Sequence, residues 1–98
     1  MWAEISIKHV HFTPAGEQQH ASKNQTLVGF ITALFAQVLI IDGFRLVRRA
    51  SGRYSILFPT CRSQGGKVHR IVLACNRREH REIERRLLEV MRAQQVIQ

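Results

Sequence analysis

Guanidinium groups are the side chains of this sequence whose type and spacing most clearly predict chemistry. The formal net charge is +8, and no Asp or Glu occurs between Gly43 and Arg78. That stretch contains many cations: Arg45, Arg48, Arg49, Arg53, Arg62, Lys67, Arg70, Arg77 and Arg78. Arginine binds phosphate through two parallel hydrogen bonds and stacks on bases, so the composition predicts a polyanionic partner. A basic surface that only confers solubility is the alternative.

Two groups of these cations are spaced to act together. At about 100° per residue, Arg77, Arg81, Arg85 and Arg92 form one stripe of a helix, with Arg78 at its margin. We expect the helix to contact phosphates and the preceding hairpin to fix register or reach base edges. The predicted nucleic-acid-binding residues are Arg62, Lys67, Arg70, Arg77, Arg78, Arg81 and Arg85. Alternatively, Arg85 pairs with Glu82 or Glu89 along the helix, and Arg81 with Glu84.

A hairpin and a helix must position these cations. The sequence predicts a strand over Arg53 to Thr60, a polar turn over Cys61 to Gly66 and a strand over Lys67 to Cys75. Tyr54, Ile56 and Phe58 fall on one face of the first strand, where core packing is favoured over base stacking.

The helix has a clear start signal and an apolar face. Asn76 is a favoured N-cap, and Glu79 can complete a capping box. The apolar residues that recur on one face are Ile83, Leu87, Val90 and Met91. We expect this face to cover a sheet, and the tail after Arg92 to fray.

The first half of the chain predicts more strands. Residues 1–12 predict a strand in which the apolar side chains change from one face to the other along its length, which suggests a bulge. Residues 13–26 predict a polar loop. The apolar stretch from Leu27 to Ile41 is compatible with a buried helix, two strands or a short membrane segment. Its β-branched and aromatic content favours two strands turning near Ala36 and Gln37, and Gln37 and Asp42 disfavour a membrane span.

Part of the chain resembles a known family. The segment PTCRSQGGKVHRIVLACN, from Pro59 to Asn76, is similar to the pattern P-S-[KR]-[KR]-T-P-D-G-E-[FY]-[RK]-D-I-A-H-P-I-N of the stage V sporulation protein G (SpoVG) family. That family's strand and Asn-Gly turn resemble the segment LIIDGFRLVRRASG, from Leu39 to Gly52. The predicted helix also follows at the expected place, so the likeness covers roughly Leu39 to Met91. The family's Pro-Asp-Gly is replaced by Gln64-Gly65-Gly66. The resemblance implies a bacterial DNA-binding regulator of transcription, septation and sporulation, with RNA as an alternative ligand.

These features together predict one domain over residues 1–98, of the α+β class. We expect a single antiparallel sheet of four to five strands with one C-terminal helix packed on it. Because one helix cannot shield both faces of such a sheet, we expect a homodimer through a sheet edge or the open face. No signal peptide is evident, and Cys61 and Cys75 lie too far apart along the predicted hairpin to bridge, so we expect a cytoplasmic protein without cofactors.

Other functions receive less support from the residues. A basic module that binds an acidic protein or joins a ribonucleoprotein is the main alternative. An enzyme would have to use Cys61 with His69 across the hairpin, and Asp42 to orient a histidine, without any accompanying catalytic motif. His9 and His11 lack a third metal ligand nearby. An RNA-recognition motif would need a second helix.

Overall fold

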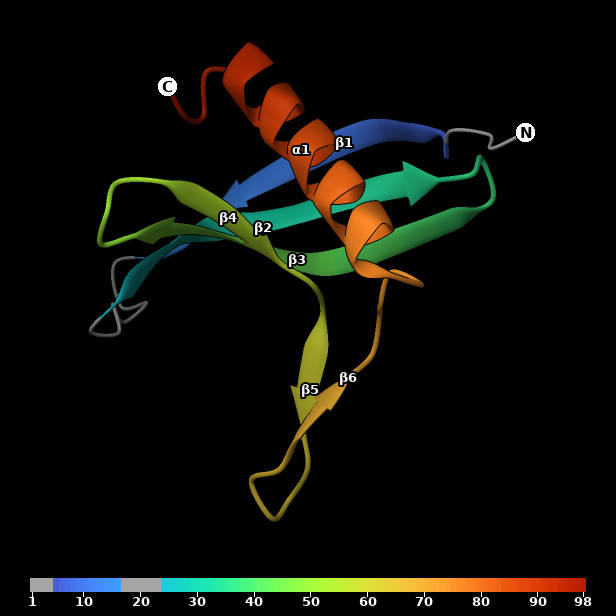
Figure 1. Ribbon diagram of the computed structural model, residues 1–98, viewed down its shortest axis with the longest axis vertical. Coiled ribbons are helices and arrows are strands. Elements are labelled where there is room, and N and C mark those ends of the chain that lie inside the picture. The colour runs from blue at the N-terminus through green and yellow to red at the C-terminus, as the bar shows by residue number, and fades with distance from the viewer. Residues whose placement is uncertain (1–4, 17–23) are drawn as a thin grey trace.

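An antiparallel sheet with one helix across one of its faces forms the body of the molecule (Figure 1). The computed structural model describes residues 5–16 and 24–98. The sheet has four strands in the order β1-β2-β3-β4, and β5 and β6 form a separate two-stranded sheet. The elements are β1 Ile7–Pro14, β2 Gln25–Phe35, β3 Leu39–Arg49, β4 Tyr54–Leu57, β5 Thr60–Arg62, β6 Val68–Arg70 and α1 Arg77–Ala93. The predicted α+β class with one C-terminal helix is confirmed.

The long apolar stretch forms two strands, as its composition favours. β2 and β3 pair as an antiparallel hairpin, and the turn residues Ala36 and Gln37 have φ angles of 54° and 63°. Two successive positive φ angles are typical of the type I′ turn that joins twisted strands, and Val38 N donates to Phe35 O at 3.2 Å. The helix and membrane alternatives for this stretch are therefore wrong. Within the described residues, no helix is long and apolar enough to cross a membrane.

The core lies between the sheet and α1. Phe44, Leu46 and Ile56 project from β3 and β4 and are at most 1% exposed, and Leu87 and Met91 of α1 are fully buried. Burying each such side chain contributes about 1.5–3 kcal/mol. The expected apolar face of the helix is thus the face that docks on the sheet.

The opposite face of the sheet carries a mixed surface. Phe30, Arg45 and Leu57 are direct cross-strand neighbours on β2, β3 and β4. The parity of the strands places them away from the buried Phe44 and Leu46. The helix lies across the other face (Figure 1), although Val47, which has the same parity as Arg45, is only 1% exposed.

Both ends of α1 are held by specific contacts. The Asn76 side chain accepts a hydrogen bond from Glu79 N at 2.9 Å, which confirms the predicted N-cap. The prediction that the tail after Arg92 frays is wrong. Gln94 Nε2 donates to Val10 O at 3.1 Å, and Ile97 is only 5% exposed in the core. Val96 also packs against the core, so two apolar residues near the terminus anchor the tail although they add little to helical periodicity.

The predicted hairpin over residues 53–75 is divided. The strand predicted to run from Arg53 to Thr60 breaks at Phe58 and Pro59: β4 joins the main sheet, and β5 leaves it. Proline has no N–H to donate to a ladder, and Pro59 O instead accepts from Ile71 N at 3.1 Å. The second strand ends at Arg70, so the expected continuation to Cys75 is also wrong. β5 and β6 form a projecting hairpin, residues 60–70, which we call the arm.

The strand predicted over residues 1–12 forms from Ile7 onward in the described residues and contains the expected bulge, and residues 1–4 of that prediction lie outside them. β1 spans Ile7–Pro14, and its register with β2 shifts between Lys8 and His11. His9 at this irregularity has a φ of 52°. Half of the loop predicted over residues 13–26, residues 17–23, lies outside the described residues, whereas Thr13 and Pro14 belong to β1 and Gln25 and Thr26 to β2.

Candidate nucleic-acid interface

The arm presents three of the predicted binding residues. It projects away from the sheet (Figure 1), and every residue from Thr60 to Arg70 is exposed. Thr60 pairs with Arg70 and Arg62 with Val68, so Arg62 and Arg70 lie on the same face. Lys67 lies at the tip, where its N–H donates to Ser63 Oγ at 3.2 Å. The arm is thus a narrow basic ribbon with little apolar packing of its own.

The start of α1 continues this basic surface. Arg77 and Arg78 are its first two residues, Arg81 follows one turn later, and all three are exposed. Figure 1 shows the first turn of the helix at the end of the segment that rises from the base of the arm. Cations are disfavoured at the positive end of a helix dipole, whereas a phosphate is favoured there. A bound phosphate would therefore relieve the repulsion that these arginines create.

Arg85 is held by two carboxylates of its own helix. Its Nη2 donates to Glu82 Oε1 and its Nη1 to Glu89 Oε1, both at 2.5 Å. The side-chain hydrogen bond from Arg85 lowers the pKa of Glu82, and the hydrogen bond to Glu82 raises the pKa of Arg85. The alternative that Arg85 pairs along the helix is confirmed. For Arg81, no salt bridge to Glu84 is found among the described residues.

A cleft at the base of the arm adds two residues, Arg45 and His80, that are not among the predicted binding residues. It has a volume of about 310 Å³, and Arg45, Arg70 and His80 come to it from three different elements. Arg45 Nη2 donates to Thr60 Oγ1 at 3.5 Å, and the His80 ring stacks on Phe58 with centroids 4.4 Å apart. Arg45 and Arg70 are brought together by the register of β3 with β4 and of β5 with β6, which periodicity alone cannot give.

The residues considered for other chemistry are dispersed. Cys61 and His69 are cross-strand neighbours, as expected, but both are exposed on the arm. Asp42 accepts hydrogen bonds from Thr32 Oγ1 and, at 2.8 Å, from Gly43 N. Both cysteines are free. Within residues 5–16 and 24–98, no group of three or more His, Cys, Asp or Glu side chains is placed to hold a metal ion.

The two aromatic residues of the predicted strand belong mainly to the core. Phe58 is 9% exposed and packs edge-on against Phe44, with ring centroids 5.1 Å apart. Tyr54 is half-buried and packs against the same core. Core packing, the favoured interpretation for both, is therefore confirmed.

The arginines divide between two ends of the molecule. Arg92, which the helical stripe groups with Arg77 and Arg81, lies in the last turn of α1. There it lines a different cleft, together with Arg49 and Arg53 from the β3–β4 connection. The cations grouped by periodicity thus belong to two separate surfaces.

The chain was compared with protein-family models, with curated proteins and with solved structures, and no match was found.

Proposed function

We propose that this protein binds nucleic acid through the arm and the first turns of α1. The observation that carries the proposal is the shared face of Arg62 and Arg70 on a projecting ribbon, continued by Arg77, Arg78 and Arg81 at the start of the helix. No acidic residue occurs in the chain between Gly43 and Arg78 to offset this charge. Phosphate neutralisation by such a surface supplies most of non-specific nucleic-acid affinity.

The shape of the arm favours duplex DNA as the ligand, with RNA as the alternative. A two-stranded β-ribbon fits the major groove of B-form DNA, whereas the major groove of an RNA helix is too narrow. In this arrangement Arg62 and Arg70 face the base edges, and Arg77, Arg78 and Arg81 contact the backbone. The resemblance to the SpoVG family supports a role as a bacterial regulator of gene expression and septation.

The proposal can be tested with two variants that lose the same charge at opposite ends of the molecule. One replaces Arg62, Lys67 and Arg70 with Gln, and the control replaces Arg48, Arg53 and Arg92 with Gln. Gel-shift titration of a DNA duplex at several salt concentrations should show a larger loss of affinity for the arm variant than for the control at each salt concentration, because each lost base-edge contact costs about 1–3 kcal/mol. Equal losses would show that only total charge matters and would overturn the assignment.

A basic protein-interaction module is the competing function, and the same titration distinguishes it. If the wild-type protein binds neither duplex nor single-stranded oligonucleotides at low salt, the arm must recognise an acidic protein surface. Binding to an acidic polypeptide, with no binding to DNA or RNA, would then replace the present proposal.

We also propose that the protein acts as a homodimer. Val38, Leu39 and Ile40 at the β2–β3 turn are 84%, 56% and 70% exposed, and Ile71 and Leu73 beyond the arm are 61% and 63% exposed. Val38, Leu39 and Leu73 border an apolar cavity of about 230 Å³. Contiguous exposed apolar surface of this kind marks interaction sites, and a second copy would bury it.

Sedimentation velocity tests the dimer. The wild-type protein should show a concentration-dependent shift to twice the monomer mass, and Leu39→Glu/Leu73→Glu should remain monomeric. If the wild-type protein keeps the monomer mass at all concentrations, the homodimer proposal is wrong. We also propose a cytoplasmic location, and the free, exposed Cys61 and Cys75 support it because a reducing compartment keeps thiols unpaired.

A further inference from the structure

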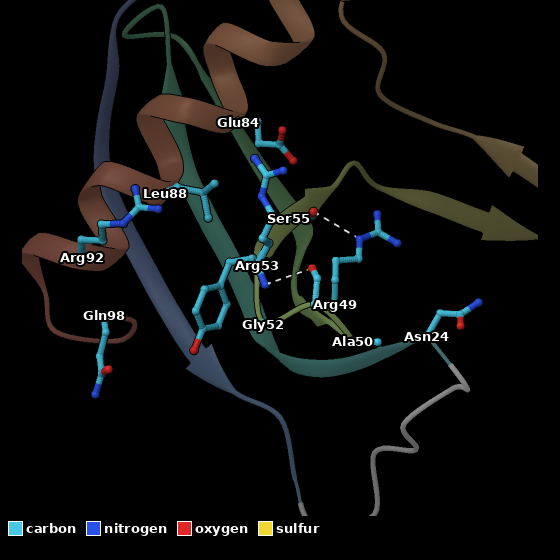
Figure 2. Close-up of a pocket in the computed structure, with 12 residues that line it drawn as sticks. Asn24, Arg49, Ala50, Gly52, Arg53, Ser55, Glu84, Leu88, Arg92 and Gln98 are labelled. Atoms are coloured by element: carbon cyan, nitrogen blue, oxygen red, sulfur yellow. Dashed lines mark hydrogen bonds between the residues drawn. The ribbon is translucent and has the colours of Figure 1, made fainter.

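A second polar cleft lies at the end of the molecule opposite the arm. It is formed by the β3–β4 connection, the second half of α1 and the C-terminal residue, and its volume is about 730 Å³. Figure 2 shows the side chains that line it. We call it the turn–helix cleft. Its volume is within the range of sites that hold drug-sized ligands and cofactors, about 300–1,000 Å³.

Two arginines from different elements converge on this cleft. Figure 2 shows the guanidinium groups of Arg53 and Arg92 on either side of Leu88. Both arginines are exposed, and neither forms a salt bridge to any described carboxylate. Two such groups that flank one space form a favourable site for a phosphate, which accepts bidentate hydrogen bonds from each.

A third arginine is fixed at the margin of the cleft. Arg49 Nη1 donates to Gln25 Oε1 at 2.8 Å, and its Nε donates to Ser55 Oγ at 3.2 Å. In Figure 2 its guanidinium group points away from Arg53 and Arg92. Its charge therefore adds to the positive potential of the cleft while its hydrogen bonds remain within the protein.

The one acidic side chain of the cleft is also fixed. Glu84 Oε2 accepts a hydrogen bond from Ile56 N at 2.8 Å, which ties the helix to β4. No donor among the described residues is hydrogen-bonded to its Oε1, which can accept from a hydroxyl or amino group of a ligand. With three arginines and one glutamate in the lining, the cleft keeps a formal excess of positive charge. It suits a ligand that has a phosphate at one end and hydrogen-bond donors near it.

Apolar surface completes the lining. Leu88 is 9% exposed, and Tyr54 is half-buried between the cleft and the core. Gly52 has a φ of 91°, and nothing lies within 4 Å of where its Cβ would be, so the turn leaves the entrance open. A flat ring system could pack on this side while its phosphate meets the arginines.

We propose that the turn–helix cleft binds a nucleotide-sized phosphate ester. Arg53 and Arg92 hold the phosphate, Glu84 accepts from a sugar hydroxyl or base amine, and Tyr54 and Leu88 contact the base or sugar. This site is separate from the arm, so the protein would bind a small phosphorylated ligand independently of the proposed nucleic-acid contacts. The same phosphate chemistry could come from a free nucleotide or from the terminal phosphate of a strand.

Titration calorimetry with the full chain tests the site. The probes are adenosine 5′-monophosphate, adenosine and inorganic phosphate. The variants are Arg53→Gln/Arg92→Gln and, as a charge-matched control, Lys8→Gln/Arg48→Gln, whose side chains are exposed outside this cleft and outside the arm. Loss of two charge-assisted contacts should weaken the monophosphate at least about tenfold in the first variant, with a smaller change in the control. Adenosine should bind weakly to all three proteins. Equal weakening in both variants, or no binding of the monophosphate to the wild type, would overturn the proposal.

Two further experiments define the ligand. Glu84→Gln keeps an oxygen that can accept from Ile56 N but removes the negative charge, so inorganic phosphate should bind more tightly. Weaker binding would contradict the assigned geometry.

Oligonucleotides with and without a 5′-phosphate show whether the phosphate belongs to a free nucleotide or to a strand end. If the phosphorylated strand loses its advantage in Arg53→Gln/Arg92→Gln, the cleft reads strand ends. If the 5′-phosphate gives no advantage to the wild type while the monophosphate still binds, the ligand is a free nucleotide.

Discussion

Arg85 binds Glu82 through the Nε and Nη2 edge of its guanidinium group. Nη2 donates to Oε1 at 2.5 Å, and Nε donates to Oε2 at 3.2 Å, one helical turn away. This bidentate geometry directs the arginine along the helix surface, and its Nη1 donates to Glu89 Oε1. A cation held in this way has less free charge and fewer free donors for an external phosphate. Among the predicted binding residues, Arg85 should therefore contribute least.

The first prediction concerns the pKa of Glu82. The hydrogen bond from Arg85 lowers this pKa, so Arg85→Gln should raise it toward the ordinary glutamate value. A lowered folded-state pKa means that the pair stabilises the protein above the unfolded-state pKa, and that this contribution is lost as pH falls through the folded-state value. Carboxyl-detected NMR titration would measure the shift. Arg92→Gln serves as the control, and a Glu82 pKa unchanged by Arg85→Gln would contradict the bidentate pair.

The second prediction separates two neighbouring arginines of the helix. Arg81→Gln should lower the log–log salt slope of DNA binding by about one, because an exposed guanidinium leaves the surface. Arg85→Gln should change the slope much less, because its charge is already balanced by Glu82 and Glu89. Both variants carry the same formal charge, so each controls for the other. If the two slopes fall equally, Arg85 exchanges its carboxylates for phosphate on binding.

The fold could be predicted where local signals agree. Asn76 is a cap residue followed by a 3.6-residue apolar period, and both features act within a few residues of chain. The break at Phe58 in the strand predicted from Arg53 to Thr60 could not be foreseen, because the alternation of side chains continues where Pro59 ends the ladder. Whether a strand crosses from one sheet to another depends on long-range pairing, which side-chain pattern does not specify.

The candidate site was predictable only in its charges. The cations of the arm and of the helix start were evident from composition and period, but the pairing of Arg45 with the arm base was not. Arg45 is separated from Arg70 in sequence, and only the register of two sheets brings both to the same cleft. Helical periodicity also grouped arginines that do not share one binding surface, since Arg92 lies in the last turn of α1 and Arg77 is its first residue.

The third prediction concerns the C-terminal anchor. Ile97→Ala should lower the free energy of unfolding by about 2–5 kcal/mol, because it leaves a cavity against the buried end of α1. Ile97 is 5% exposed and Gln98 next to it is exposed, so Gln98→Ala should change the value by less than about 0.5 kcal/mol. Urea denaturation followed by circular dichroism measures both. Equal, small effects would mean that the tail detaches in solution.

The fourth prediction uses the strained turn between β2 and β3. Ala36 and Gln37 adopt φ angles of 54° and 63°, a conformation that costs a residue with a Cβ about 1–2 kcal/mol. Asn and Gly adopt it readily, so Ala36→Asn/Gln37→Gly should raise the free energy of unfolding by about 1 kcal/mol, part of the gain being offset by the entropy of glycine. Gly52→Ala is the inverse experiment, since φ is 91° and no atom lies within 4 Å of the added Cβ. It should destabilise by a similar amount through backbone conformation alone. If both variants leave the urea midpoint unchanged, the two turns relax without cost and backbone strain plays no part in the stability of the sheet.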